Sequence, residues 1–253
     1  MQTINNNIGF LTANQRGDFI SFFNQNNSRY HGWFFRNANS LFKVVEDIVI
    51  TKKGIVQENF FMPENDTAMV YELSNINDFD LFLDFKPIYG NSEEERTYTI
   101  EQDKKNITIE CKNKKDKVFL AIKLDRHNFS IKEQWIKKTY SYDIERNSPP
   151  YERYVFWLAT IKAKKMVLAV GDTKKHALSE ANYVFKKTNK LKKEKQQAVK
   201  KSLDFSKFKD LEISRAYLCA QNSLRELKTS AGLPWFFNVW ARDLFISMKA
   251  MSI

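Results

Sequence analysis

Hydrophobic and polar residues alternate with a period of two over much of the first two thirds of this 253-residue chain, which predicts β-strands. Apolar side chains occupy every second position at Phe79, Leu81, Leu83 and Phe85, at Ile107, Ile109 and Cys111, and at Val118, Leu120, Ile122 and Leu124. Short apolar runs over residues 43–51, 54–59, 154–161 and 161–170 are further candidate strands. Because these strands follow one another with no helical period between them, we predict antiparallel sheets packed as a large sandwich over residues 1–172.

The pattern changes after residue 171, where a helical period begins. Asp172 or Thr173 can cap this helix, and its apolar positions recur every three or four residues at Ala177, Ala181, Phe185 and Thr188. We expect the helix to continue into a lysine-rich stretch and to break over residues 203–208. A second helix is predicted over residues 209–228, and a last one begins near Asp243.

The formal net charge is +11, and most of it lies in one stretch. Residues 186–209 hold ten lysines, no arginine and two acidic residues, so this stretch alone carries +8. It is not accompanied by an RNA-binding or helix-turn-helix pattern, so we interpret it as a solvated helix face rather than a nucleic-acid site. An acidic surface on a partner is the alternative ligand for these lysines.

Several classes of protein are disfavoured by what the sequence contains. It has no apolar run near the roughly 18 residues of a membrane span, and its first residues do not resemble a signal peptide. Cys111 and Cys219 form no motif and fit a reducing cytoplasm. The three histidines, His31, His127 and His176, have no ligand at metal-binding spacing. We therefore expect a cytoplasmic protein with no metal site, no cofactor and no membrane partner.

The richest chemistry lies in residues 230–243, which read Ser-Ala-Gly-Leu-Pro-Trp-Phe-Phe-Asn-Val-Trp-Ala-Arg-Asp. Gly and Pro open this segment as a loop. Aromatic rings can contact the apolar faces of sugars, and a carboxylate beside a guanidinium can accept hydrogen bonds from two neighbouring hydroxyls. Trp235, Trp240, Arg242 and Asp243 are therefore candidate pyranose-binding residues. A buried aromatic loop with a structural ion pair is the alternative interpretation.

This segment closely resembles the Ala-Gly-x-Pro-Trp-Phe…Trp-x-Arg-Asp signature of archaeal and bacterial glycogen debranching enzymes of the amylo-α-1,6-glucosidase type. Ala241 stands where that family usually has Gly, and Val239 where a polar or acidic residue is common. Residues 27–34, Asn-Ser-Arg-Tyr-His-Gly-Trp-Phe, resemble a signature of the family's N-terminal β domain. A weaker resemblance, to that domain's late strands, covers residues 135–140 together with Asp143, Arg146 and Glu152. The three motifs occur in the family's order.

The resemblance implies a mainly β fold with a helical C-terminal part. Residues 1–172 would form an antiparallel β super-sandwich, residues 173–208 a basic linker helix, and residues 209–253 the first helices of an incomplete (α/α)6 barrel. The resemblance implies that Arg242 and Asp243 hold the terminal glucose. We interpret Arg29, Tyr30 and His31 as a structural strand start, because the family has this motif in its non-catalytic domain, and ligand contact is the alternative. The resemblance places the catalytic carboxylates further along the chain, so no catalytic residue is assigned.

A complete barrel needs more chain than follows residue 208. Twelve helices of about 11–12 residues require roughly 130–140 residues, and 45 remain. We expect one subunit or portion of a split debranching enzyme that acts on an α-glucan and is completed by a second chain. A stand-alone α-glucan-binding module and an inactive truncated gene product are the alternatives. The second chain is favoured because Leu244, Phe245, Met248 and Met251 would otherwise extend an exposed apolar face.

Overall fold

The computed structural model describes the strands before residue 62, most of the chain between residues 66 and 204, and a few positions up to Ile213. The described residues are 2–5, 9–13, 20–24, 33–37, 44–45, 48–51, 54–61, 63, 66–83, 96–103, 106–113, 116–139, 144–145, 147, 149, 151–204, 209–210 and 213.

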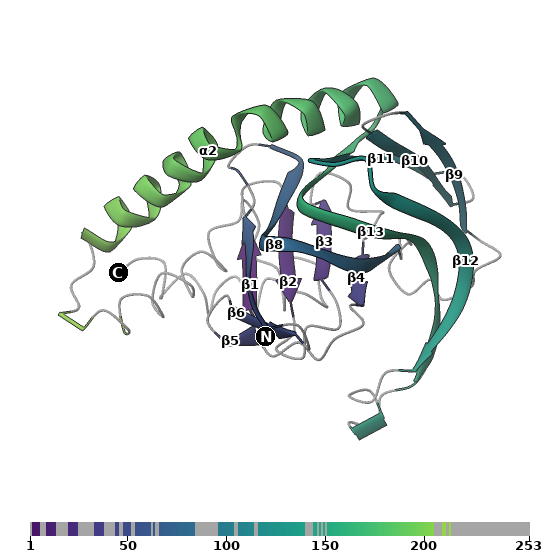
Figure 1. Ribbon diagram of the computed structural model, residues 1–253, viewed down its shortest axis with the longest axis horizontal. Coiled ribbons are helices and arrows are strands. Elements are labelled where there is room, and N and C mark those ends of the chain that lie inside the picture. Colours follow the sequence, from purple (N-terminus) through teal and green to yellow (C-terminus); the bar gives the residue numbers. More distant parts are fainter. Residues whose placement is uncertain are drawn as a thin grey trace, which may run out of the picture.

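These residues form thirteen strands, paired antiparallel throughout, and one long helix (Figure 1). The elements are β1 (Gln2–Asn5), β2 (Gly9–Ala13), β3 (Ile20–Asn24), β4 (Trp33–Asn37), β5 (Val44–Val45), β6 (Ile48–Thr51), β7 (Gly54–Phe61), β8 (Ala68–Leu83), β9 (Arg96–Gln102), β10 (Asn106–Asn113), β11 (Asp116–Leu124), β12 (Phe129–Thr139), β13 (Glu152–Gly171) and α2 (Lys174–Asp204).

The two longest strands, β8 and β13, pair along almost their whole length and divide the sheet into two wings. Around the first half of β8 lies the helix-side wing, made of β5 to β7, residues 68–73 of β8, residues 165–171 of β13, β11, β10 and β9. Around its second half lies the opposite wing, made of β1 to β4, residues 79–83 of β8, residues 152–161 of β13, and β12.

A bend between the wings folds the sheet over its own core. Four residues of β8, 73–76, oppose only Lys164 of β13, because the register passes from Asn77↔Ala163 to Glu72↔Lys165. Tyr71 and Phe79 would lie about 26 Å apart along a straight strand. Their ring centroids are instead 5.3 Å apart, edge to face. Residues that precede and follow the bend therefore share one core.

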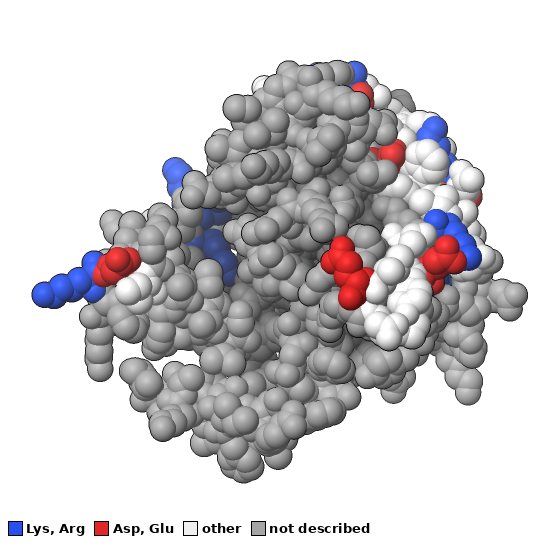
Figure 2. Space-filling view, turned by 90° about the horizontal axis from the view of Figure 1, so that it is seen from below, with Lys and Arg blue, Asp and Glu red and all other residues white. Residues whose placement is uncertain are grey.

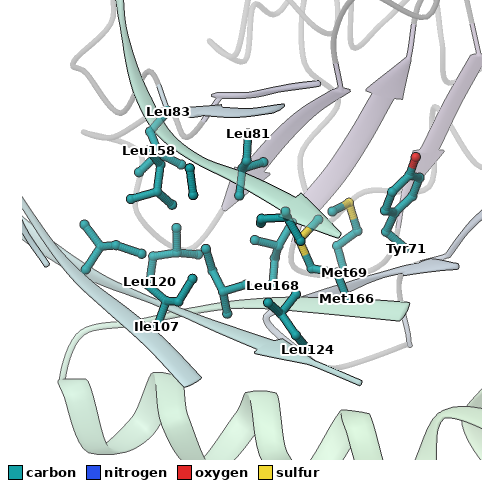
Figure 3. Packing of buried hydrophobic residues seen from close by; sticks show 14 of the residues in the cluster. Met69, Tyr71, Leu81, Leu83, Ile107, Leu120, Leu124, Leu158, Met166 and Leu168 are labelled. Carbon is teal, nitrogen blue, oxygen red and sulfur yellow. The ribbon is translucent and has the colours of Figure 1, made fainter. Parts of the chain in front are cut away.

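Side chains from both wings fill this core. Figure 3 shows several of them pointing into the same space between β8, β10, β11 and β13. Fully buried members include Met69, Leu83, Ile107, Ile109, Leu120, Ile122, Leu158, Ile161 and Leu168. The alternation in the sequence therefore marks the positions that face the core, as expected for a sheet with a buried face.

The helix α2 covers the outer face of the helix-side wing (Figure 1). Small side chains permit this close packing: Ala177, Ala181 and Val184 of α2 lie against Ala68, Val70, Ala121, Val167 and Ala169 of the sheet. The helix begins with a side-chain cap, since the Thr173 Oγ1 accepts a hydrogen bond from the His176 amide at 3.1 Å. The order of layers is therefore helix, helix-side wing, opposite wing.

The broad expectation of a mainly β, antiparallel chain with a later helix is confirmed. Two details differ. Residues 154–161 and 161–170, which read as separate runs, belong to one 20-residue strand, β13. The helix α2 also continues to Asp204, two residues into the predicted break. The predicted helix over residues 209–228 and the final helix lie, almost entirely, outside the described residues.

Candidate functional site

All four sequence-predicted sugar-binding residues, Trp235, Trp240, Arg242 and Asp243, lie outside the described residues. The motif residues Arg29, Tyr30 and His31 do so as well, as do Asp143 and Arg146. The structure therefore leaves their mutual arrangement untested. The described residues instead form the β-sheet and the helix α2, which precede residues 230–243, and they include several polar and ionisable side chains.

Part of the late-strand motif lies within the described residues, and Trp135, Lys137 and Glu152 of this part have structural contacts. Trp135 packs among aromatic rings, with centroids 5.4 Å from Phe156 and 5.6 Å from Tyr98. The guanidinium of Arg96, itself buried, lies 4.8 Å from the centroid of the Trp135 ring, and its Nη2 donates to the Tyr154 carbonyl at 3.0 Å. This cluster joins β9 of the helix-side wing to β12 and β13 of the opposite wing.

The exposed end of the same motif is an ion pair. Lys137 of β12 bonds Glu152 of β13, and the Thr139 hydroxyl donates to the Glu152 carboxylate at 3.4 Å. The hydrogen bond and the attraction between the two charges raise the pKa of Lys137 and lower the pKa of Glu152. Because both groups are in contact with solvent, we interpret the pair as a cross-strand contact that holds the hairpin ends in register.

Polar contacts as well as packing attach α2 to the sheet. Lys192 forms an ion pair of 3.1 Å with Glu72 of β8, and both side chains are partly buried. Lys165 of β13 donates to the Phe185 carbonyl at 3.0 Å and lies 4.3 Å from the centroid of that residue's ring. Burial is the main reason why the pKa of Lys165 falls below its ordinary value. These contacts anchor α2, which precedes the segment that the sequence predicts to bind sugar.

Two carboxyl groups influence each other where β8 begins under α2. The Thr67 amide donates to Glu180 Oε1 at 3.0 Å. Burial, followed by the charge and the hydrogen bond of Glu180, raises the pKa of the neighbouring Asp66 to about 6.

Two other potentially reactive side chains of the described residues, Cys111 and His127, are packed against neighbouring side chains. Cys111 is completely buried, and burial raises its pKa well above the ordinary value, so it carries a thiol rather than a nucleophilic thiolate. His127 packs edge to face on Phe129, with ring centroids 4.8 Å apart.

Within the residues that the structure describes, no three His, Cys, Asp or Glu side chains gather as a metal site would require. No helix of that part is both long and apolar enough to cross a membrane.

Trp157 lies on the face of the opposite wing that points away from the main core, and it is partly buried. The sequence pattern predicted only that it belongs to a strand, over residues 154–161. The Trp157 ring lies 5.9 Å from Phe82 and 5.5 Å from the Lys132 amine. Its indole N–H is buried and has no acceptor among the described residues. The cross-strand register of β8 with β13 brings Phe82 and Trp157 together, and no local sequence spacing encodes that pairing.

Charges of both signs lie close together on one face of the described chain. Figure 2 shows Lys or Arg atoms beside Asp or Glu atoms at more than one place, rather than one broad field of a single sign on this face.

No family model matches the chain, and no curated protein matches it. The resemblance to debranching enzymes consequently rests on the sequence motifs.

Proposed function

We propose that this 253-residue chain forms the β domain and part of the glucose-binding subsite of an α-glucan-cleaving enzyme of the amylo-α-1,6-glucosidase type, acting in the cytoplasm. The observation that carries this proposal is the motif over residues 231–243, where two Trp precede an adjacent Arg–Asp pair. An antiparallel β body followed by a helix from Lys174 supports it, because the family has the same order. The two wings would then be the sheets of the super-sandwich, and residues from 209 onward would begin the (α/α)6 barrel.

The proposed subsite assigns a separate task to each of four side chains. Asp243 accepts hydrogen bonds from two neighbouring glucose hydroxyls, and Arg242 keeps that carboxylate ionised and oriented. Trp235 and Trp240 shape the wall against the apolar face of the ring. Loss of one preorganised charged contact of this kind costs about 2–4 kcal/mol of transition-state binding. That cost corresponds to a fall of roughly 30- to 1,000-fold in kcat/KM.

In this proposal, the 253 residues supply neither the general acid nor the general base. The resemblance assigns them to barrel segments beyond the sugar-binding motif, in the same polypeptide or in a partner chain. The 253 residues alone should therefore bind an α-glucan without releasing glucose from it.

Glucose release from a limit dextrin tests the proposal. The chain is assayed alone and after assembly with the barrel segments, as wild type, Asp243→Asn and Arg29→Ala. We expect no release by the chain alone, release after assembly, a roughly 30- to 1,000-fold loss in Asp243→Asn, and a much smaller change in Arg29→Ala. Circular dichroism checks that both variants are folded.

Two outcomes would oppose the proposal in different ways. Turnover by the isolated chain that survives Asp243→Asn would mean that the active site lies elsewhere. A stable monomer that binds glucan and does not associate with barrel segments would instead indicate a stand-alone α-glucan-binding module.

A further inference from the structure

The two sides of helix α2 differ in chemistry. One side packs on the helix-side wing through Ala177, Ala181 and Val184, which are completely buried. In Figure 1 the helix runs along the outer edge of the described structure. The side that faces away from the sheet is exposed, and several lysines of the basic stretch lie on it.

Four exposed lysines and one exposed tyrosine form a continuous patch on this outward side. Each member lies three or four positions from another, and residues with this spacing are neighbours on a helix surface. We call the patch the lysine face of α2; its members are Tyr183, Lys186, Lys187, Lys190 and Lys193. The Tyr183 side chain is well exposed, with a fractional exposure of 46% for the residue.

The acidic groups of the described residues do not neutralise the lysine face. Glu194 lies 3.6 Å from Lys190, and both side chains are exposed. No described carboxylate lies within ion-pair distance of Lys186, Lys187 or Lys193. Like charges three or four positions apart destabilise a helix. A bound anionic group would therefore relieve a repulsion that these residues leave in place.

Two other lysines of α2 differ from those of the lysine face because they pair with the sheet. Lys174 forms an ion pair with Glu101 of β9, and Lys192 forms one with Glu72 of β8. These contacts attach the helix to the helix-side wing. The lysine face is the part of the positive charge of α2 that points toward solvent and is accessible to another molecule.

Three kinds of anionic partner are worth comparing, and the structure favours one of them. A helix that binds a membrane surface buries its apolar side in the lipid, but the apolar side of α2 is packed on the sheet. Nucleic-acid sites favour arginine, whose planar guanidinium bonds phosphate through two N–H groups, and residues 174–204 contain none. Tyrosine is enriched at interfaces between proteins, so an exposed Tyr183 among lysines fits an acidic protein.

We propose that the lysine face of α2 binds an acidic surface of a protein partner, whose carboxylates lie beside the four lysines. Because the packed side of α2 already holds the helix on the sheet, binding does not have to order it, and this lowers the entropic cost of association. The proposal does not depend on the glucan proposal, since it uses no residue of the segment predicted to bind sugar.

Binding of fluorescein-labelled poly-L-glutamate to the full chain, followed by fluorescence anisotropy, tests the lysine face. The test variant combines Lys186→Gln, Lys190→Gln and Lys193→Gln, because Gln removes the charge and keeps a good helix propensity. We expect wild type to bind at about 50 mM salt and more weakly at about 200 mM. The variant should bind at least about fivefold more weakly than wild type at the lower salt.

A control variant with the same net charge separates the lysine face from charge alone. It combines Lys112→Gln, Lys162→Gln and Lys164→Gln, which are exposed positions on β10 and β13. We expect this control to bind within about twofold of wild type. Circular dichroism and thermal melting check that both triple variants are folded.

Three results would overturn the proposal. The first is no binding of poly-L-glutamate by wild type at the lower salt. The second is an equal loss of binding in the two triple variants, which would show an effect of net charge alone. The third is tighter binding of a labelled oligouridylate of the same length, lost in the lysine-face variant, which would assign the face to nucleic acid.

Discussion

Replacing Gly171 with Ala tests how tightly α2 is held to the sheet. Gly171 is the last residue of β13, directly before the turn into α2. A Cβ added there would lie 2.8 Å from the Ala177 amide nitrogen, and 3.1 Å and 3.2 Å from atoms of the His176 side chain. The closest of these atoms is backbone, and the Ala177 amide donates to the Thr173 carbonyl at 3.0 Å. The added methyl group therefore meets the first turn of the helix itself.

Two effects of this substitution oppose each other, and their sizes decide the sign. A Gly→Ala change at an unstrained position stabilises a protein by about 0.4–1 kcal/mol through the entropy of the unfolded chain. Forcing an extra methyl group into a packed site costs about 1–3 kcal/mol. Ala177 is completely buried against the sheet, so the first turn cannot move without disturbing that packing. We expect a net destabilisation of roughly 1–2 kcal/mol.

Urea unfolding measures this change as a lower midpoint with an unchanged slope. In a chain of this length, each kcal/mol should also lower Tm by about 2–4 °C. Ser179→Ala is the matched control, because Ser179 is an exposed position on α2 and Ala favours helix. A Gly171→Ala protein as stable as wild type would refute the described approach of β13 to α2.

The remaining predictions concern the helix cap, the core and the isolated chain. Thr173→Ala should lower stability by about 1 kcal/mol in urea unfolding, whereas Asp172→Ala should change it less, because the cap bond comes from Thr173. Ile109→Ala, at a completely buried core position, should cost about 2–5 kcal/mol by the same assay, and a loss below 1 kcal/mol would contradict the shared core. The isolated chain should release no glucose from limit dextrin in a coupled glucose assay.

Local signals in the sequence predicted the local features of the fold. The alternation at Ile107, Ile109 and Cys111 predicted β10 because one face of that strand is buried. Capping is equally local, so the start of α2 after Thr173 could be predicted. Asp80 shows the limit of alternation: it reads as an outward polar position, yet it is buried and accepts a 2.6 Å hydrogen bond from Thr160.

Features that depend on distant segments could not be predicted. The bend of β8 over residues 73–76 follows from different partners on its two halves, β7 for one and β4 for the other. Thr67 and Glu180 are 113 positions apart, and only the packing of α2 on the sheet brings them together. The sugar-binding role predicted for residues 230–243 rests on motif chemistry, because these residues lie outside the described chain.

Affinity for a maltooligosaccharide, measured by isothermal titration calorimetry on the purified chain, tests whether the predicted segment binds glucose. We expect wild type to bind and Asp243→Asn to bind roughly 30- to 1,000-fold more weakly, with an unchanged circular dichroism spectrum. Arg29→Ala should bind as wild type does. Absence of binding by wild type, or equal affinity of wild type and Asp243→Asn, would contradict the assignment of the glucose subsite to this segment.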